Sequence, residues 1–180
     1  MVNAKITQWE SGFKMVKRFA LVVALSLSLV PLARGEVPAP QLGEVRVKLP
    51  LPLPYDQNAD AKAQVDAALA KAKASGKRLL IDLGGNWCAD CRVFSGIIEA
   101  PEVHKWVDQH FEVVLVDVGR FNANLDIPAR FGIQKLEAAP SILIVSPQGQ
   151  LLNGGDIVAL QDARSMTPQA VIDWLAKWAA

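Results

Sequence analysis

The segment at residues 84–92, Gly-Gly-Asn-Trp-Cys-Ala-Asp-Cys-Arg, constrains the fold more than any other part of the chain. It holds the chain's two cysteines, Cys88 and Cys91, and follows an apolar run at residues 78–83. Residues 92–98, which come next, can form a helix. The order of strand, tight turn, Cys-x-x-Cys and helix is what a dithiol redox site requires. It places Cys88 at a helix N-terminus, where free N–H groups and the helix dipole favour a thiolate.

Two other interpretations of the cysteine pair remain open. A structural disulfide is the default in an oxidising compartment, but cysteines so close in sequence close a small loop that stabilises little. A zinc site needs about four ligands, and besides the cysteines the chain has two histidines, His104 and His110. They are six positions apart on an expected helix and do not share one face. The sequence therefore predicts no metal and no cofactor beyond the Cys88–Cys91 dithiol.

Residues 1–35 have the order of a secretory signal peptide. An apolar run at residues 19–30 is followed by small residues at positions 33 and 35, and the run is shorter than the about 20 residues of a membrane span. We expect export, to the bacterial periplasm, of a protein that is soluble after cleavage. An uncleaved N-terminal membrane anchor is the alternative, and Met15 is a second candidate start. The basic residues before the apolar run are Lys14, Lys17 and Arg18.

Composition indicates one domain with additional sequence at its ends. The chain has 180 residues, of which 51% are hydrophobic, so it can bury a sizeable core. Residues 1–35 hold five basic residues and one acid, and the remainder therefore carries three more acids than bases. This mildly acidic remainder gives no signal for nucleic-acid binding.

A proline-rich extension at residues 36–57 precedes the expected domain at residues 58–180. Its repeated prolines favour an extended backbone. Residues 44–49 alternate polar and apolar side chains and could add an edge strand. We expect the extension to be a linker that lies against the domain, and a segment that docks a partner is the alternative.

Hydrophobic periodicity and turn residues predict an α/β fold. The near-continuous apolar run at residues 111–118 favours a central strand that is covered on both faces. The order of elements predicts a mixed sheet flanked by helices. The expected helices are at residues 60–75, 92–98, 101–110, 125–131 and from 168 onward, and the expected strands at 79–83, 111–118, 141–145 and 150–152.

These features together resemble the thioredoxin fold, from about Asp60 to Trp178. Trp-Cys-x-x-Cys follows an apolar strand, and Asp82 lies six residues before Cys88, at the position of the family's buried aspartate. The pair Ala139-Pro140 comes just before a strand and fits the family's cis-proline loop. The chain is also similar to exported thioredoxin-like proteins that have Gly-Asn-Trp-Cys-x-Asp-Cys-Arg and a later Asn-Leu-Asp. The resemblance implies that residues 58–180 are a thioredoxin-like domain with a central mixed sheet and helices on both faces.

The chain departs from thioredoxin at three places. The residues between the cysteines are Ala89 and Asp90 rather than Gly-Pro, and the residue before Pro140 is the small Ala139. The segment at residues 134–138 is longer than the matching turn of thioredoxin. Thioredoxin's substrate range therefore does not transfer to this chain.

The resemblance and the chemistry of the residues assign roles in disulfide exchange. Cys88 is the expected nucleophile, with a pKa below the free value of ~8.5, and forms a mixed disulfide with the substrate. Cys91 then attacks the Cys88 sulfur and releases the reduced substrate, and the reverse order would make an oxidase. Asp82, as a buried acid with a raised pKa, would exchange the Cys91 proton through water. A solvated or salt-bridged acid at a strand end is the alternative for Asp82.

The remaining site residues tune the potential or contact the substrate. The Asp90 carboxylate disfavours a neighbouring thiolate and favours a reducing potential, unless it points to solvent or Arg92 offsets its charge. Trp87 shields the site and forms a rim for substrate, with simple packing as the alternative. Ala139 and Pro140 present a backbone edge to an extended substrate.

The sequence therefore predicts an exported thiol–disulfide oxidoreductase that acts on protein disulfides as a reductase or an isomerase-type helper. Such a reductase needs an electron donor, for which we expect a membrane-bound thiol carrier. Two alternatives remain open: an oxidase that donates its disulfide, and a binding or assembly protein that keeps the fold without turnover.

Overall fold

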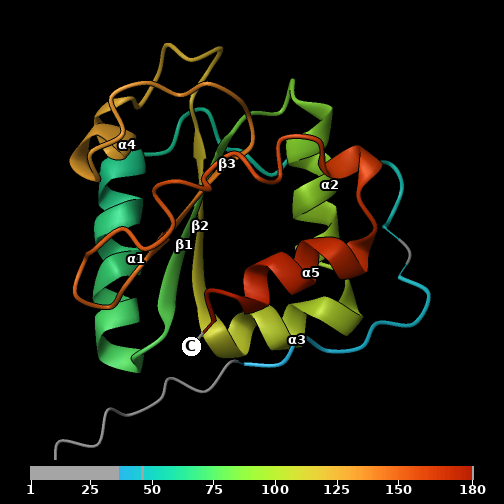
Figure 1. The fold of residues 1–180 in the computed structure, drawn as a ribbon. Helices are drawn as coiled ribbons and strands as arrows, with labels where there is room; N and C mark the ends of the chain where they lie inside the picture. Colours follow the sequence, from blue (N-terminus) through green and yellow to red (C-terminus); the bar gives the residue numbers. More distant parts are fainter. Residues whose placement is uncertain (1–36, 46, 180) are drawn as a thin grey trace, which may run out of the picture. The chain divides into compact units, whose positions relative to one another are not determined.

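The computed structural model describes residues 37–45 and 47–179, so the predicted signal peptide lies outside the described residues. The described chain contains one mixed sheet of three strands in the order β2-β1-β3 (Figure 1). β1 spans Arg78–Gly84, β2 Phe111–Asp117 and β3 Ser141–Val145. β1 is parallel to β2 and antiparallel to β3, and it is therefore the central strand.

Helices cover both faces of this sheet, as predicted. α1 and α4 lie on one face, and α2, α3 and α5 lie on the other (Figure 1). Alternate residues of β1 belong to two apolar clusters, one under each layer of helices. The helices are α1 Ala61–Ser75, α2 Ala89–Ile98, α3 Pro101–His110, α4 Asp126–Arg130, the 3-10 turn η1 Ala163–Ser165 and α5 Pro168–Ala176.

Residues at the helix ends explain where the first and last helices begin and stop. The Asp60 side chain accepts a hydrogen bond from the backbone N–H of Ala63 at the start of α1. Gly76 ends this helix with φ +78°, in the left-handed region that glycine adopts without strain. Thr167 caps α5 in the same way, with Pro168 in its first turn. These three boundaries confirm the predictions from the sequence.

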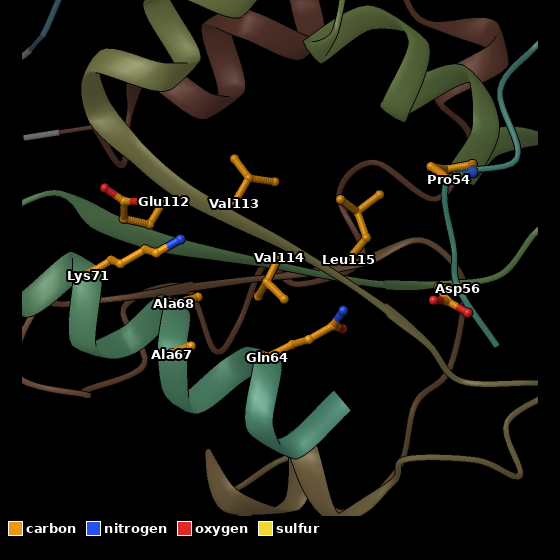
Figure 2. A pocket seen from close by; sticks show the side chains of 10 residues that line it. All are labelled: Pro54, Asp56, Gln64, Ala67, Ala68, Lys71, Glu112, Val113, Val114 and Leu115. Atoms are coloured by element: carbon orange, nitrogen blue, oxygen red, sulfur yellow. The ribbon is translucent and has the colours of Figure 1, made fainter. Parts of the chain in front are cut away.

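β2 is an edge strand in the described part of the chain, so its predicted central position is wrong. Its apolar run reflects the covering of both faces, by α1 on one side and α3 on the other. A strand with two covered faces has the same sequence pattern at the edge as in the middle of a sheet. Figure 2 shows a hollow along β2, between the side chains of α1 and two residues of the extension, Pro54 and Asp56.

The predicted return strand at residues 150–152 is reduced to an isolated bridge between Leu151 and Val145. The side chain of Asn153 replaces the next part of such a strand. Its Oδ1 accepts a hydrogen bond from Ile144 N, and its Nδ2 donates to Ile142 O, both at 2.8 Å. The buried amide therefore satisfies two backbone groups at this edge of β3, and the backbone of Leu152 and Ile157 satisfies two others.

The extension packs on the domain as irregular chain, and no strand forms at residues 44–45 and 47–49, against the prediction. Val45 and Val47 pack against the apolar cluster beneath α2 and α5. A Cβ at Gly96 of α2 would come within 2.5 Å of Val47, so the two segments lie in close contact. Val45 and Val47 are therefore partly buried against the helices instead of lying in a strand, and Leu49 is exposed.

Candidate active site

Cys88 and Cys91 form a disulfide at the N-terminus of α2. Their Cα atoms are 5.3 Å apart, and Cys88 is the N-cap residue of the helix. The backbone N–H of Cys91 donates to Cys88 Sγ at 3.1 Å. Cys88 is slightly exposed and Cys91 is completely buried. An incoming thiol or disulfide would therefore reach Cys88 first, and a charge on its sulfur would face a helix N-terminus.

The loop before β3 places a backbone carbonyl next to Cys88. The Ala139–Pro140 peptide bond is cis. Ala139 O lies 3.4 Å from Cys88 Sγ. Ala139 also packs against the small cluster that contains the two cysteines. The fold thus brings Cys88 and Ala139, which are 51 positions apart in the sequence, into contact.

Asp82 lies on β1 and is completely buried. Its Oδ2 accepts a hydrogen bond of 2.6 Å from the hydroxyl of Tyr55, and its Oδ1 has no hydrogen-bond partner. Burial raises the pKa of Asp82 to about 7, although the Tyr55 hydrogen bond acts in the opposite direction. The carboxyl group is therefore not solvated at the strand end, and it can gain or lose a proton near neutral pH.

Tyr55 is a site residue that the sequence analysis missed. It belongs to the proline-rich extension, yet it is buried in one cluster with Cys88 and Cys91. Its backbone N–H donates to Asn86 Oδ1 at 3.1 Å, and its carbonyl accepts from Asn86 Nδ2 at 2.8 Å. It is the chain's single tyrosine and follows directly on Pro54. That isolated aromatic residue was the available signal, but the prolines around it indicated a linker.

Asp90 is buried and paired with a cation that is distant in the sequence. Its carboxylate accepts hydrogen bonds from the backbone N–H and the Nε of Arg164, at 2.9 and 3.1 Å. The proposed partner Arg92 donates instead to the carbonyls of Leu51 and Pro52 in the extension. Asp90 therefore neither points freely to solvent nor has its charge offset by Arg92, and Arg164 supplies the opposite charge.

Trp87 forms an exposed rim beside the disulfide, with 41% of its surface accessible. Its Nε1 donates to the carbonyl of Gly119 at 2.6 Å, and its ring meets Phe121 edge to face at 6.0 Å between centroids. The Arg120 guanidinium lies 4.8 Å from the ring centroid. The loop after β2 therefore fixes the indole while one side of it stays open.

Neither a metal site nor a membrane-spanning helix is present among the described residues. In residues 37–45 and 47–179, no three His, Cys, Asp or Glu side chains come together as a metal site. None of the helices described is long and apolar enough to span a membrane. The hollow along β2 in Figure 2 is lined by α1, β2 and the end of the extension, and neither cysteine lines it.

Comparison with known proteins identifies the family. A family model described as thioredoxin-like matches residues 60–147. A solved structure, the disulphide isomerase from Xylella fastidiosa Temecula1, is 37% identical and superposes with a TM-score of 0.65, over 71% of this chain and 97% of that chain. The chain belongs to the thioredoxin-like family. The predicted thioredoxin fold is thereby confirmed, and Tyr55 lies before the residues that the family model matches.

Two further solved structures are similar to this thioredoxin-like protein at lower identity. Poplar thioredoxin h is 22% identical with a TM-score of 0.39, over 51% of this chain and 74% of that chain. The oxidised C-terminal domain of DsbD from Neisseria meningitidis is 22% identical with a TM-score of 0.39, over 52% and 83%. No match was found among curated protein sequences.

Proposed function

We propose that this thioredoxin-like protein is a thiol–disulfide oxidoreductase that reduces or rearranges disulfides of exported proteins. The observation that carries the proposal is the arrangement of its disulfide. Cys88 caps α2 at the surface beside Ala139 O, and Cys91 lies buried below it in one cluster with Tyr55, whose hydroxyl bonds to Asp82. This arrangement supports attack through the Cys88 sulfur and resolution through the Cys91 sulfur.

The reaction in the reducing direction has two exchange steps. The Cys88 thiolate attacks a substrate disulfide, which forms a mixed disulfide and releases one substrate thiolate. Cys91 then loses its proton and attacks the Cys88 sulfur, which releases the second substrate thiolate and forms the Cys88–Cys91 disulfide. The two electrons pass from the dithiol to the substrate, and the Cys91 proton passes to Asp82. Asp82, with its pKa of about 7, can accept this proton at neutral pH.

The reducing or isomerising direction is supported by two observations. The relative that is 37% identical is described as a disulphide isomerase, and an isomerase needs a free thiolate to begin each cycle. Asp90 places a carboxylate inside the Cys-x-x-Cys segment, which disfavours the thiolate form, although Arg164 offsets part of its charge. We infer export to the periplasm, where a membrane-bound thiol carrier would return the electrons.

We propose that an extended substrate segment docks between Trp87 and the Ala139-Pro140 loop. The exposed indole provides a flat apolar surface on one side of Cys88. Ala139 provides a small side chain on the other side, which leaves the backbone edge open. A bulky residue at position 139 would narrow this approach to the sulfur.

Insulin reduction with dithiothreitol tests the activity. The wild-type protein should accelerate the reaction, and Cys88→Ser should not. Absence of acceleration by the wild type would contradict the proposed function. The redox potential tests the direction of electron transfer. A value of about −270 mV supports a reductase, whereas a value of about −120 mV would indicate an oxidase.

A further inference from the structure

We propose that the hydroxyl of Tyr55 relays the proton between Cys91 and Asp82. This inference rests on the proposed function and adds a named group to its second step. The relay is supplied by the proline-rich extension rather than by the part of the chain that matches the family model, which begins at residue 60. The extension would then be part of the catalytic machinery and not only a linker.

The Tyr55 hydroxyl bonds to Asp82, and its side chain belongs to one buried cluster with Cys91. It donates to Asp82 Oδ2 at 2.6 Å. Gly84 is the last residue of β1, and the absence of a side chain there leaves room for the hydroxyl and the sulfur. A Cβ at Gly84 would lie 2.5 Å from the Tyr55 hydroxyl oxygen and 2.9 Å from Cys91 Sγ. The hydroxyl and the buried sulfur therefore border the same small space beside Gly84.

A hydroxyl group can act as a relay because it donates and accepts at the same time. When Cys91 attacks the mixed disulfide, its S–H proton passes to the Tyr55 oxygen, and the proton on Tyr55 passes to Asp82 Oδ2. Tyr55 is unchanged at the end, Asp82 has gained one proton, and the departing substrate thiolate carries the negative charge. The reverse transfer returns the proton when the disulfide is reduced.

The charges around Tyr55 favour a relay over a stable phenolate. Burial and the Asp82 carboxylate both raise the pKa of Tyr55, so its hydroxyl stays protonated. The titratable groups that face it are Asp82 on β1, Asp117 at the end of β2 and the two cysteines at α2. Both carboxylates oppose a negative charge on the tyrosine, and Asp82 remains the final proton acceptor.

Two sets of contacts hold the extension so that the hydroxyl stays in place. The side-chain amide of Asn86, in the turn before Cys88, bonds to both backbone groups of Tyr55. Arg92 of α2 bonds to the carbonyls of Leu51 and Pro52 at 2.7 and 2.8 Å. Both anchoring residues belong to the segment that carries the cysteines. The redox motif therefore fixes the position of the tyrosine that serves it.

Stopped-flow reaction of the reduced full-length protein with 5,5′-dithiobis(2-nitrobenzoate) separates the two exchange steps. The attack by Cys88 releases a first thionitrobenzoate, and the resolution by Cys91 releases a second. Tyr55→Phe keeps the ring and removes the hydroxyl. We expect the first phase within about twofold of wild type and the second phase slowed about tenfold or more at neutral pH, since positioned acid–base groups contribute about 10²-fold or more. Leu53→Ala, at an exposed position of the same extension, is the control and should change neither phase.

The pH dependence and a double variant distinguish a relay from a structural role. The wild-type second phase should show a transition near the pKa of Asp82, and Tyr55→Phe should lose it. In the Asp82→Asn background, Tyr55→Phe should cause no further loss, because both residues act in one transfer. A second phase of Tyr55→Phe with wild-type rate and pH profile would overturn the relay alone. A wild type that releases no second thionitrobenzoate would overturn the relay and the proposed function together.

Discussion

Asp90 lies two residues after Cys88 and forms an ion pair with Arg164. Asp90 lies in the first turn of α2, where a carboxylate is favoured by the helix dipole but disfavours a thiolate on Cys88. Arg164, in η1, bonds to this carboxylate through its backbone and its side chain. The arginine thus compensates the acid and also ties η1 to the redox helix.

Replacing Arg164 should make the dithiol more reducing. Arg164→Gln leaves the Asp90 charge beside Cys88, which destabilises the thiolate of the reduced form. Charges with an exposed partner interact by up to about 1 kcal/mol, and a loss of this size in the stability of the thiolate corresponds to a potential about 20 mV more negative. Equilibration with glutathione measures the shift. Asp90→Asn should move the potential the other way, and equal or inverted shifts would contradict this account.

At the scale of single residues, the sequence predicts the chemistry that is local in the chain. The roles of Cys88, Cys91 and Asp82 stay predictions, but their positions in one short segment already implied that they lie close together. Tyr55 and Arg164 could not be found this way. Each reaches the site from a distant segment, and nothing local to either residue signals the partner that it contacts.

The edge of β3 shows how one side chain can replace part of a strand. Asn153 is buried and bonds to the backbone of Ile142 and Ile144. A backbone group that is buried without a partner costs about 1–3 kcal/mol. The segment after β3 therefore stays irregular without leaving these groups unsatisfied.

Removal of this amide should destabilise the whole domain. Asn153→Ala leaves one N–H and one carbonyl of β3 without their partner, and we expect a loss of about 2–4 kcal/mol in the free energy of unfolding. Urea denaturation measures it, with Asn58→Ala, at an exposed position, as the matched control. Equal stabilities of the two variants would show that the amide does not hold this edge.

At the scale of elements, helices and strands with strong end signals could be predicted, as the caps at Asp60 and Thr167 illustrate. The predictions of a return strand and of a strand at residues 44–49 were wrong, because a pattern of apolar residues only indicates which side chains are buried. It does not show whether they are buried against a strand or a helix. The edge position of β2 could not be predicted either. Both of its faces are covered by helices, so its sequence is as apolar as that of a central strand.

The burial of Asp82 makes the stability of the whole molecule depend on pH. Its pKa is raised from an ordinary value of 3.8 to about 7 in the folded state. Between these values the folded state binds more protons than the unfolded state. The contribution of Asp82 to stability therefore falls as pH rises through this window, and it is constant above and below it.

Asp82→Asn should abolish this dependence. The variant should gain stability relative to wild type as pH rises from 4 to 8, by about 4 kcal/mol in total, because each pKa unit corresponds to about 1.36 kcal/mol. Denaturation of the reduced and the oxidised protein at several pH values measures the difference. A difference that does not change with pH would contradict a carboxyl group that titrates near neutral pH inside the fold.

The fold class of the whole molecule followed from the order of its elements, and the family comparison confirmed it. The extension lies against the domain, as expected, but the residues that it contacts did not follow from the sequence. Its prolines predict an extended backbone but do not indicate on which surface it packs. Its contacts with Asn86, Arg92 and Gln169 form only in the assembled domain. The division between extension and domain after residue 57 stays a proposal.

The most direct test of the central claim is the trapping of mixed disulfides on Cys91→Ser in the compartment where the protein works. This variant can attack a substrate through Cys88 but cannot resolve the product. We predict adducts with other proteins that disappear on treatment with dithiothreitol and that are absent from Cys88→Ser. Absence of adducts on Cys91→Ser, or the same adducts on both variants, would contradict the claim that Cys88 exchanges disulfides with protein substrates.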